Sequence, residues 1–228
     1  MKPKTKGIIS ILFGAVSLLF ISLPWLLILF GILSIIFGFK ANKEKQKKLG
    51  MAGMTLGIIS LLLIILYFLS FLIIGNSPLF VFESCSMYHE SSFDKWWNKE
   101  GNYYEQQSIT KEQFQEFPLK NGFEKGDLLF VLSSSQHNIG EVIMFLPSSR
   151  SKLYPIAHRI IVLNPIGTKG DHNLRQLTSN NNAGGLDETN ISQEKIIGKV
   201  KFKIPYLGWA KLLFLEPLKP KATRGFCK

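Results

Sequence analysis

The sequence predicts a mainly β fold, a sheet or barrel, carried on an N-terminal helical membrane anchor of two or three transmembrane helices. Two charge-free stretches predict the anchor: residues 7–39 and 49–82 each exceed the ~20 apolar residues that a helix needs to cross a bilayer. The apolar runs after Gly126 predict the β fold, because they are short and of strand length. We therefore expect an anchor at residues 1–76 and a second domain at residues 77–228.

The number of membrane crossings depends on Pro24, which divides the first stretch into two halves. Each half would span only about 24 Å as a helix, a little short for a hydrocarbon core about 30 Å thick, so length favours two crossings in all. The charges favour three, because a turn at Pro24 keeps both lysine clusters in the cytoplasm. We favour three, and in either case the last helix, about Met51–Gly75, delivers residues 76–228 to the outer face.

The net charge of +11 is concentrated beside the membrane segments. The first 48 residues contain one acidic residue, Glu44, and eight lysines: Lys2, Lys4, Lys6, Lys40, Lys43, Lys45, Lys47 and Lys48. A lysine excess of this kind is typical of short cytoplasmic segments that flank membrane helices. The rest of the chain has no basic stripe interleaved with aromatic residues. We therefore expect a lipid bilayer, and no nucleic acid, as a partner.

The second domain is predicted to be an antiparallel sheet or barrel. Its expected strands are Leu128–Leu132, Glu141–Leu146, Ile156–Leu163 and Ile196–Ile204, with Gln136–Gly140 as a hairpin loop joining the first two. Tyr88–Lys125 departs from this pattern and is rich in aromatic and charged residues, which indicates an inserted cap with a helix starting at Thr110. Gln176–Thr189 is rich in Asn and Gly and is expected to be a surface loop.

Two cysteines, Cys85 and Cys227, are far apart in the sequence and form no disulfide framework. We expect two free thiols. The histidines have no metal-ligand spacing, and we expect no metal and no cofactor.

Five short polar motifs follow the last apolar stretch in a definite order. They are Ser84-Cys85-Ser86-Met87, Gly126-Asp127 with Gly140-Glu141, His158-Arg159, Thr168-Lys169-Gly170-Asp171-His172-Asn173, and Ile197-Gly198-Lys199. In this order they resemble signal peptidase I, and His158-Arg159 resembles the archaeal and endoplasmic-reticulum branch, which uses histidine as its base. The resemblance covers about residues 80–210.

The resemblance implies a membrane-bound serine endopeptidase that cleaves signal peptides from exported preproteins. It implies Ser86 as the nucleophile, His158 as the general base, and Ser84 as an oxyanion contact. The chemistry agrees, because a serine hydroxyl needs a neighbouring base, and an imidazole held by a carboxylate serves well. Preproteins bearing signal peptides, and a secretion translocon, are the implied partners.

The orienting carboxylate is left open by the sequence, because sixteen positions separate Asp171 from the next aspartate, Asp187, where the family has about six. We prefer Asp187, with Asp171 as the alternative and Glu188 third. Glu141 in place of aspartate and the displaced acid also support a second hypothesis. In it, the chain is a catalytically inactive membrane-tethered β module that binds exported chains.

Overall fold

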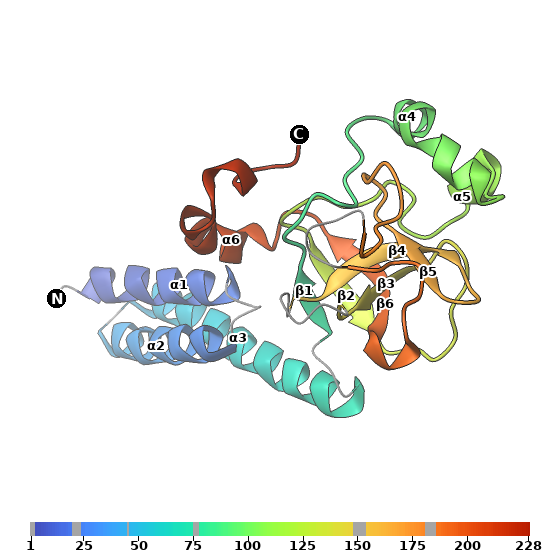
Figure 1. The fold of residues 1–228 in the computed structure, drawn as a ribbon. Coiled ribbons are helices and arrows are strands. Elements are labelled where there is room, and N and C mark those ends of the chain that lie inside the picture. The colour runs from blue at the N-terminus through green and yellow to red at the C-terminus, as the bar shows by residue number, and fades with distance from the viewer. Residues whose placement is uncertain (1–2, 20–23, 45, 75–77, 148–153, 181–185) are drawn as a thin grey trace. The chain divides into compact units, whose positions relative to one another are not determined.

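The computed structural model describes the chain except residues 1–2, 20–23, 45, 75–77, 148–153 and 181–185. The chain divides into two compact units, Met1–Ser77 and Pro78–Lys228. The first unit is helical, and the second contains the sheet (Figure 1).

The first unit consists of α1 (Pro3–Leu19), α2 (Pro24–Lys43) and α3 (Lys47–Ile74). Small residues let these helices approach closely: the Ser10 hydroxyl donates to the Ser34 carbonyl at 2.7 Å, and the Ser34 hydroxyl donates to the Gly53 carbonyl at 2.7 Å. A Cβ on Gly53 would lie 1.7 Å from the Ser10 hydroxyl oxygen, so only glycine fits there.

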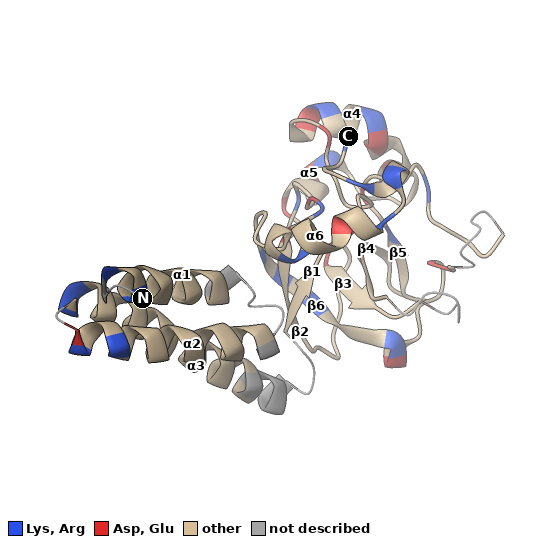
Figure 2. Ribbon diagram, turned by 90° about the vertical axis from the view of Figure 1, so that its left-hand side faces the viewer, with Lys and Arg blue, Asp and Glu red and all other residues tan. Residues whose placement is uncertain are grey.

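Within the described part of this unit, two segments are long and apolar enough to cross a membrane, Leu26–Lys43 and Lys47–Tyr67. The helix α1 has 17 residues. Figure 2 shows the described lysines of the unit gathered at one end of the helices, at the start of α1 and the end of α2. Lys6 at the start of α1 forms an ion pair with Glu44 just after α2, so these two helices run in opposite directions.

The second unit is built on one six-stranded antiparallel sheet in the order β1-β2-β6-β3-β4-β5. The strands are β1 (Leu79–Val81), β2 (Leu128–Leu132), β3 (Val142–Phe145), β4 (Ile156–Val162), β5 (Gly167–Lys169) and β6 (Ile196–Ile204). The predicted strands thus form close to their expected ends. The short edge strands β1 and β5 were not predicted, since three residues are too few to show an alternating pattern.

Two expectations about the fold are wrong. The chain as a whole is not mainly β, because helical residues outnumber strand residues once the three N-terminal helices are counted with α4–α6. The segment Gln136–Gly140 does not join a β-hairpin either, because β6 lies between β2 and β3 and pairs with both. The distant strand β6 takes the place beside β2 that β3 would occupy in a hairpin, and the local sequence carries no information about this competition.

The inserted cap contains α4 (Phe93–Gln106) and α5 (Lys111–Gln115). A capping box begins α5, since the Thr110 hydroxyl accepts from the Gln113 amide and the Gln113 side chain accepts from the Thr110 amide. A buried cluster fixes the cap on β4: Trp96, Trp97, Tyr104, Ile109, Phe114 and Ile161. The chain ends with α6 (Trp209–Leu215) and the 3₁₀ turns η2 (Glu216–Leu218) and η3 (Lys221–Thr223); a third such turn, η1 (Gln193–Lys195), precedes β6.

Candidate active site

The segment that carries Ser86 joins β1 to the cap. Met87 is fully buried in the core of the sheet and anchors the segment there. Two backbone bonds fix its course: the His172 amide donates to the Ser86 carbonyl at 2.9 Å, and the Phe123 amide donates to the Met87 carbonyl at 3.0 Å. Gly170 is needed for this approach, because a Cβ there would lie 2.7 Å from the Ser86 carbonyl oxygen.

His158 projects from β4 toward this segment. Its Nε2 lies 2.8 Å from the Ser86 hydroxyl oxygen, although the two residues are 72 positions apart. The imidazole is 3% exposed, so little water competes for the serine hydroxyl from its side. When the serine donates to Nε2, the remaining ring proton is on Nδ1 and needs an acceptor.

That acceptor is Glu188. Its Oε1 forms a hydrogen bond with His158 Nδ1 and also accepts from the Thr168 hydroxyl at 3.2 Å. Its Oε2 accepts from the Leu177 amide at 2.7 Å. The carboxylate is fully buried, and the Thr168 amide donates to the Glu188 carbonyl at 2.8 Å, which fixes the residue beside β5. A hydroxyl, an imidazole and a carboxylate in this sequence of contacts can activate a nucleophile.

Asp187, the acid that we preferred, does not contact the histidine. Its carboxylate accepts from the Thr189 amide at 3.0 Å and from the Thr189 hydroxyl at 2.6 Å, and these bonds lower its pKa. Our ranking of the acids is therefore wrong as to which one faces His158. The sequence could not have ranked Glu188 first, because the choice depends on the burial of Leu186: residues two apart on an extended chain lie on the same side, so Glu188 turns inward with Leu186.

Asp171, the alternative acid, belongs to a separate buried network. It accepts from Arg159 Nε at 3.0 Å and Nη2 at 2.7 Å, from the Tyr104 hydroxyl at 2.8 Å, and from His89 Nε2 at 3.0 Å. Burial raises the pKa of Asp171, but the charge of Arg159 and these hydrogen bonds outweigh it, so the pKa lies well below its usual range. The aspartate is thus held as a carboxylate, which orients Arg159 and the cap.

Arg159 follows His158 on β4 and points to the other face, because successive side chains of a strand alternate. Its guanidinium is fully buried, and its Nη1 donates to the carbonyls of Pro118 (2.9 Å) and Gly140 (2.8 Å). Its Nη2 also donates to the Leu119 carbonyl at 2.9 Å. With the two bonds to Asp171, all five N–H donors are used, so this residue fastens the cap to the strand that carries His158.

The cap contributes two residues to this network that sequence reasoning missed, His89 and Tyr104. The His89 ring stacks on Trp96 with centroids 3.8 Å apart. Burial lowers the pKa of His89 despite the opposing effect of Asp171, so its neutral form donates to the aspartate. Nothing in the sequence pairs these residues with Asp171, which lies 82 positions beyond His89.

Ser84 lies close to Ser86 in space as well as in sequence, with its hydroxyl oxygen 3.1 Å from that of Ser86. The side chain is exposed, so it can reach a substrate atom. Among the residues that the structure describes, no group of three or more His, Cys, Asp or Glu could hold a metal ion.

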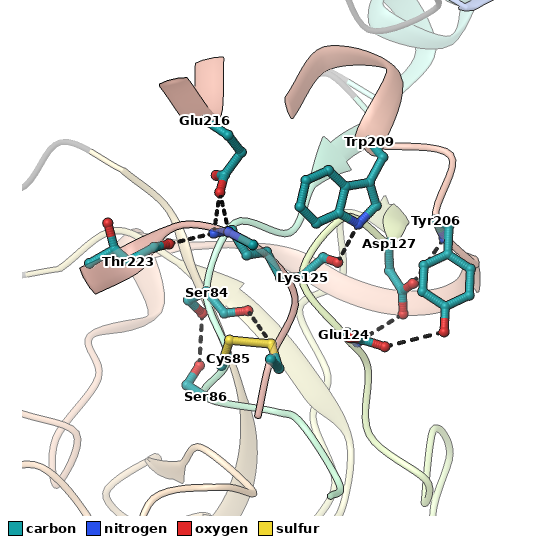
Figure 3. The surroundings of a disulfide bond; sticks show 12 residues. Ser84, Cys85, Ser86, Glu124, Lys125, Asp127, Tyr206, Trp209, Glu216 and Thr223 are labelled. Carbon is teal, nitrogen blue, oxygen red and sulfur yellow. Dashed lines mark hydrogen bonds and ion pairs between the residues drawn. A yellow bond between two sulfur atoms is a disulfide. The ribbon is translucent and has the colours of Figure 1, made fainter. Parts of the chain in front are cut away.

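Cys85 and Cys227 form a disulfide, with Cα atoms 5.5 Å apart, which corrects the expectation of two free thiols. Figure 3 shows this bond beside Ser84 and Ser86. The C-terminal segment thus returns to the residue beside Ser86 from 142 positions further along the chain, and spacing in the sequence cannot show such a return.

The chain is similar to proteins named signal peptidase complex catalytic subunit SEC11. It is 28% identical to that of Pyricularia oryzae and 32% identical to those of Sclerotinia sclerotiorum and Verticillium alfalfae. Each similarity extends over 107 residues, 43% of this chain and 59% of the relative. The chain therefore spans less than two thirds of the length of these relatives. No family model matches the chain.

Proposed function

Since the chain is a distant, partial homologue of the catalytic subunits of endoplasmic-reticulum-type signal peptidase, we propose that it is a membrane-bound serine endopeptidase that cleaves signal peptides from exported preproteins. One observation carries the proposal. The Ser86 hydroxyl is 2.8 Å from His158 Nε2, and Glu188 binds the opposite nitrogen of the same ring.

In this mechanism the Ser86 oxygen attacks the scissile carbonyl carbon while His158 Nε2 takes the hydroxyl proton. Glu188 keeps the other ring proton on Nδ1 and stabilises the imidazolium that forms. The Ser84 hydroxyl and a backbone N–H donate to the oxyanion. His158 then gives its proton to the leaving amine, and water, deprotonated by the same nitrogen, releases the acyl group from Ser86.

The preprotein binds as an extended strand at an edge of the sheet. The edge strand β1 leads directly into the serine segment, so a strand added there brings its scissile bond to Ser86. Shallow apolar pockets then select small residues at the cleavage site, as the resemblance to signal peptidase implies.

The N-terminal helices are proposed to cross the membrane three times. Lys6 and Glu44 pair at the end of the helical unit where the lysines gather, so one cytoplasmic end accounts for both lysine clusters. The catalytic domain then lies on the extracytoplasmic face. The disulfide supports this placement, because such bonds persist in oxidising compartments.

Cleavage of a preprotein by the full chain in detergent tests the proposal. Ser86→Ala should abolish cleavage, while Ser134→Ala, whose hydroxyl bonds within its own loop, should leave it unchanged. Product masses would locate the cut. Full activity of Ser86→Ala would overturn the proposal. So would a wild-type protein that neither cleaves preproteins nor reacts at Ser86 with an acylating probe, which is the behaviour of an inactive binding module.

A further inference from the structure

The disulfide lies inside the nucleophile segment, because Cys85 is the residue between Ser84 and Ser86. Its partner, Cys227, belongs to residues 206–227, which we call the clasp. The clasp contains α6 and the turns η2 and η3. The triad requires only Ser86, His158 and Glu188, so the mechanism leaves the clasp without a role.

The clasp also contacts Glu83, the residue directly before Ser84. Glu83 accepts from Lys211 at 2.8 Å and from Lys219 at 2.9 Å. Glu83 is partly exposed, and ion pairs of this kind contribute little by themselves. The covalent bond at Cys85 is therefore the principal connection between the clasp and the serine segment.

The clasp is itself fixed to the sheet domain through a buried lysine. Lys125 donates to Glu216 Oε2 at 2.8 Å and to the Thr223 carbonyl at 2.6 Å (Figure 3). The lysine is only 2% exposed. The Trp209 indole N–H donates to the Lys125 carbonyl at 3.0 Å. These bonds give the disulfide a firm attachment point on its C-terminal side.

The serine segment needs such an attachment. Residues 84–87 belong to no strand, and Ser84 is exposed. Backbone bonds fix the chain on both sides of the serines: Phe82 bonds to Gly126 and Asp127 before them, and the Ser86 and Met87 carbonyls accept from His172 and Phe123 after them. Between these points the Cys85 carbonyl accepts, among the residues that the structure describes, only from the nearby Tyr88 amide, so the disulfide is what connects Cys85 to a distant part of the fold. A displacement of about 1 Å at a reacting atom can cost about 100-fold in rate.

We propose that the Cys85–Cys227 disulfide positions Ser86 against His158, which makes Cys227 a positioning residue for the reaction. The inference rests on the proposed function. It also makes the site sensitive to dithiols. A thiolate of the dithiol attacks one sulfur, and its second thiol then closes a cyclic disulfide, which releases Cys85 and Cys227 as two thiols.

Hydrogen exchange of the full chain in detergent tests the positioning without reference to activity. Oxidised wild type, dithiol-reduced wild type and Cys227→Ser are compared, with Leu213→Ser as a control, since Leu213 is an exposed clasp residue. We expect amide exchange in residues 82–88 to rise at least 10-fold in the reduced protein and in Cys227→Ser, and not in the control. Unchanged exchange in both would overturn the inference, whether or not the chain cleaves preproteins.

Kinetics on the same samples separate positioning from simple destabilisation. We expect kcat to fall about 10- to 100-fold with KM within twofold, at temperatures where all samples remain folded, and to return on reoxidation of the wild type. Equal kcat in the oxidised and reduced wild type would refute the role. If Cys227→Ser does not fold, the reduced wild type decides alone. Absence of cleavage by the oxidised wild type would refute the proposed function, and the exchange data would still decide the positioning.

Discussion

The substitution Glu188→Gln tests which acid orients His158, because it keeps the size of the side chain and changes one oxygen to an amino group. Glu188 uses both oxygens as acceptors, one for His158 Nδ1 and the other for the Leu177 amide at 2.7 Å. A backbone N–H can only donate. The glutamine must therefore turn its oxygen toward Leu177 and its amino group toward His158.

This orientation reverses the tautomer of the imidazole. With an N–H donor at Nδ1, the ring proton moves to Nε2, and Nε2 can no longer accept the proton of Ser86. The opposite orientation of the amide would place two donors face to face in a buried site, at a cost of about 1–3 kcal/mol. The equivalent amide substitution in Ser-His-Asp proteases lowers kcat about 10⁴-fold, which corresponds to roughly 5.5 kcal/mol of barrier.

The assay measures kcat for preprotein cleavage by wild type, Glu188→Gln and the matched variant Asp187→Asn. We expect a loss of about 10³- to 10⁴-fold for Glu188→Gln. We expect Asp187→Asn to stay within twofold, because the Asp187 carboxylate contacts Thr189. The reasoning fails if Glu188→Gln keeps a tenth of the wild-type kcat while its thermal unfolding is unchanged, or if Asp187→Asn loses as much.

Three further predictions concern the surroundings of the triad. Ser84→Ala should lower kcat about 10²- to 10³-fold with little change in KM, since it removes one oxyanion donor; an unchanged kcat would exclude that role. Burial lowers the pKa of Lys169 to about 8, so between that value and its usual 10.5 the unfolded chain binds more protons and stability should rise with pH. The free energy of unfolding should rise by about 3 kcal/mol at most, and Lys169→Met should abolish this rise in denaturation measured from pH 7.5 to 10.5. Parallel pH curves for the variant and the wild type would contradict the prediction. Tyr104→Phe removes a buried bond to Asp171 and should lower the free energy of unfolding by about 2 kcal/mol with kcat within threefold; an equal stability of both proteins would show that the bond contributes nothing.

Much of the fold follows from local patterns. Leu128–Leu132 forms a strand over its predicted range because a short continuous apolar run favours a buried strand, and Ile196–Ile204 does so because its apolar residues alternate with lysines from Lys199 onward. The helix after Thr110 forms because its capping residues are adjacent in sequence. The order of the strands could not be predicted from local patterns, because the place of β6 between β2 and β3 depends on pairing across more than fifty positions.

From the amino-acid order alone it follows that two long charge-free stretches precede a domain of short strands, and the motifs identify Ser86 and His158 as a pair to test. Only the tertiary structure decided that Glu188 rather than Asp187 meets the imidazole, because neighbouring residues on an extended segment face opposite ways and the burial of Leu186 sets which way. The structure was also needed to show that Cys85 is bonded to Cys227 and that Asp171 contacts the cap. Such contacts form between residues that are far apart in the sequence, and composition and spacing do not show which distant segments come together in the fold.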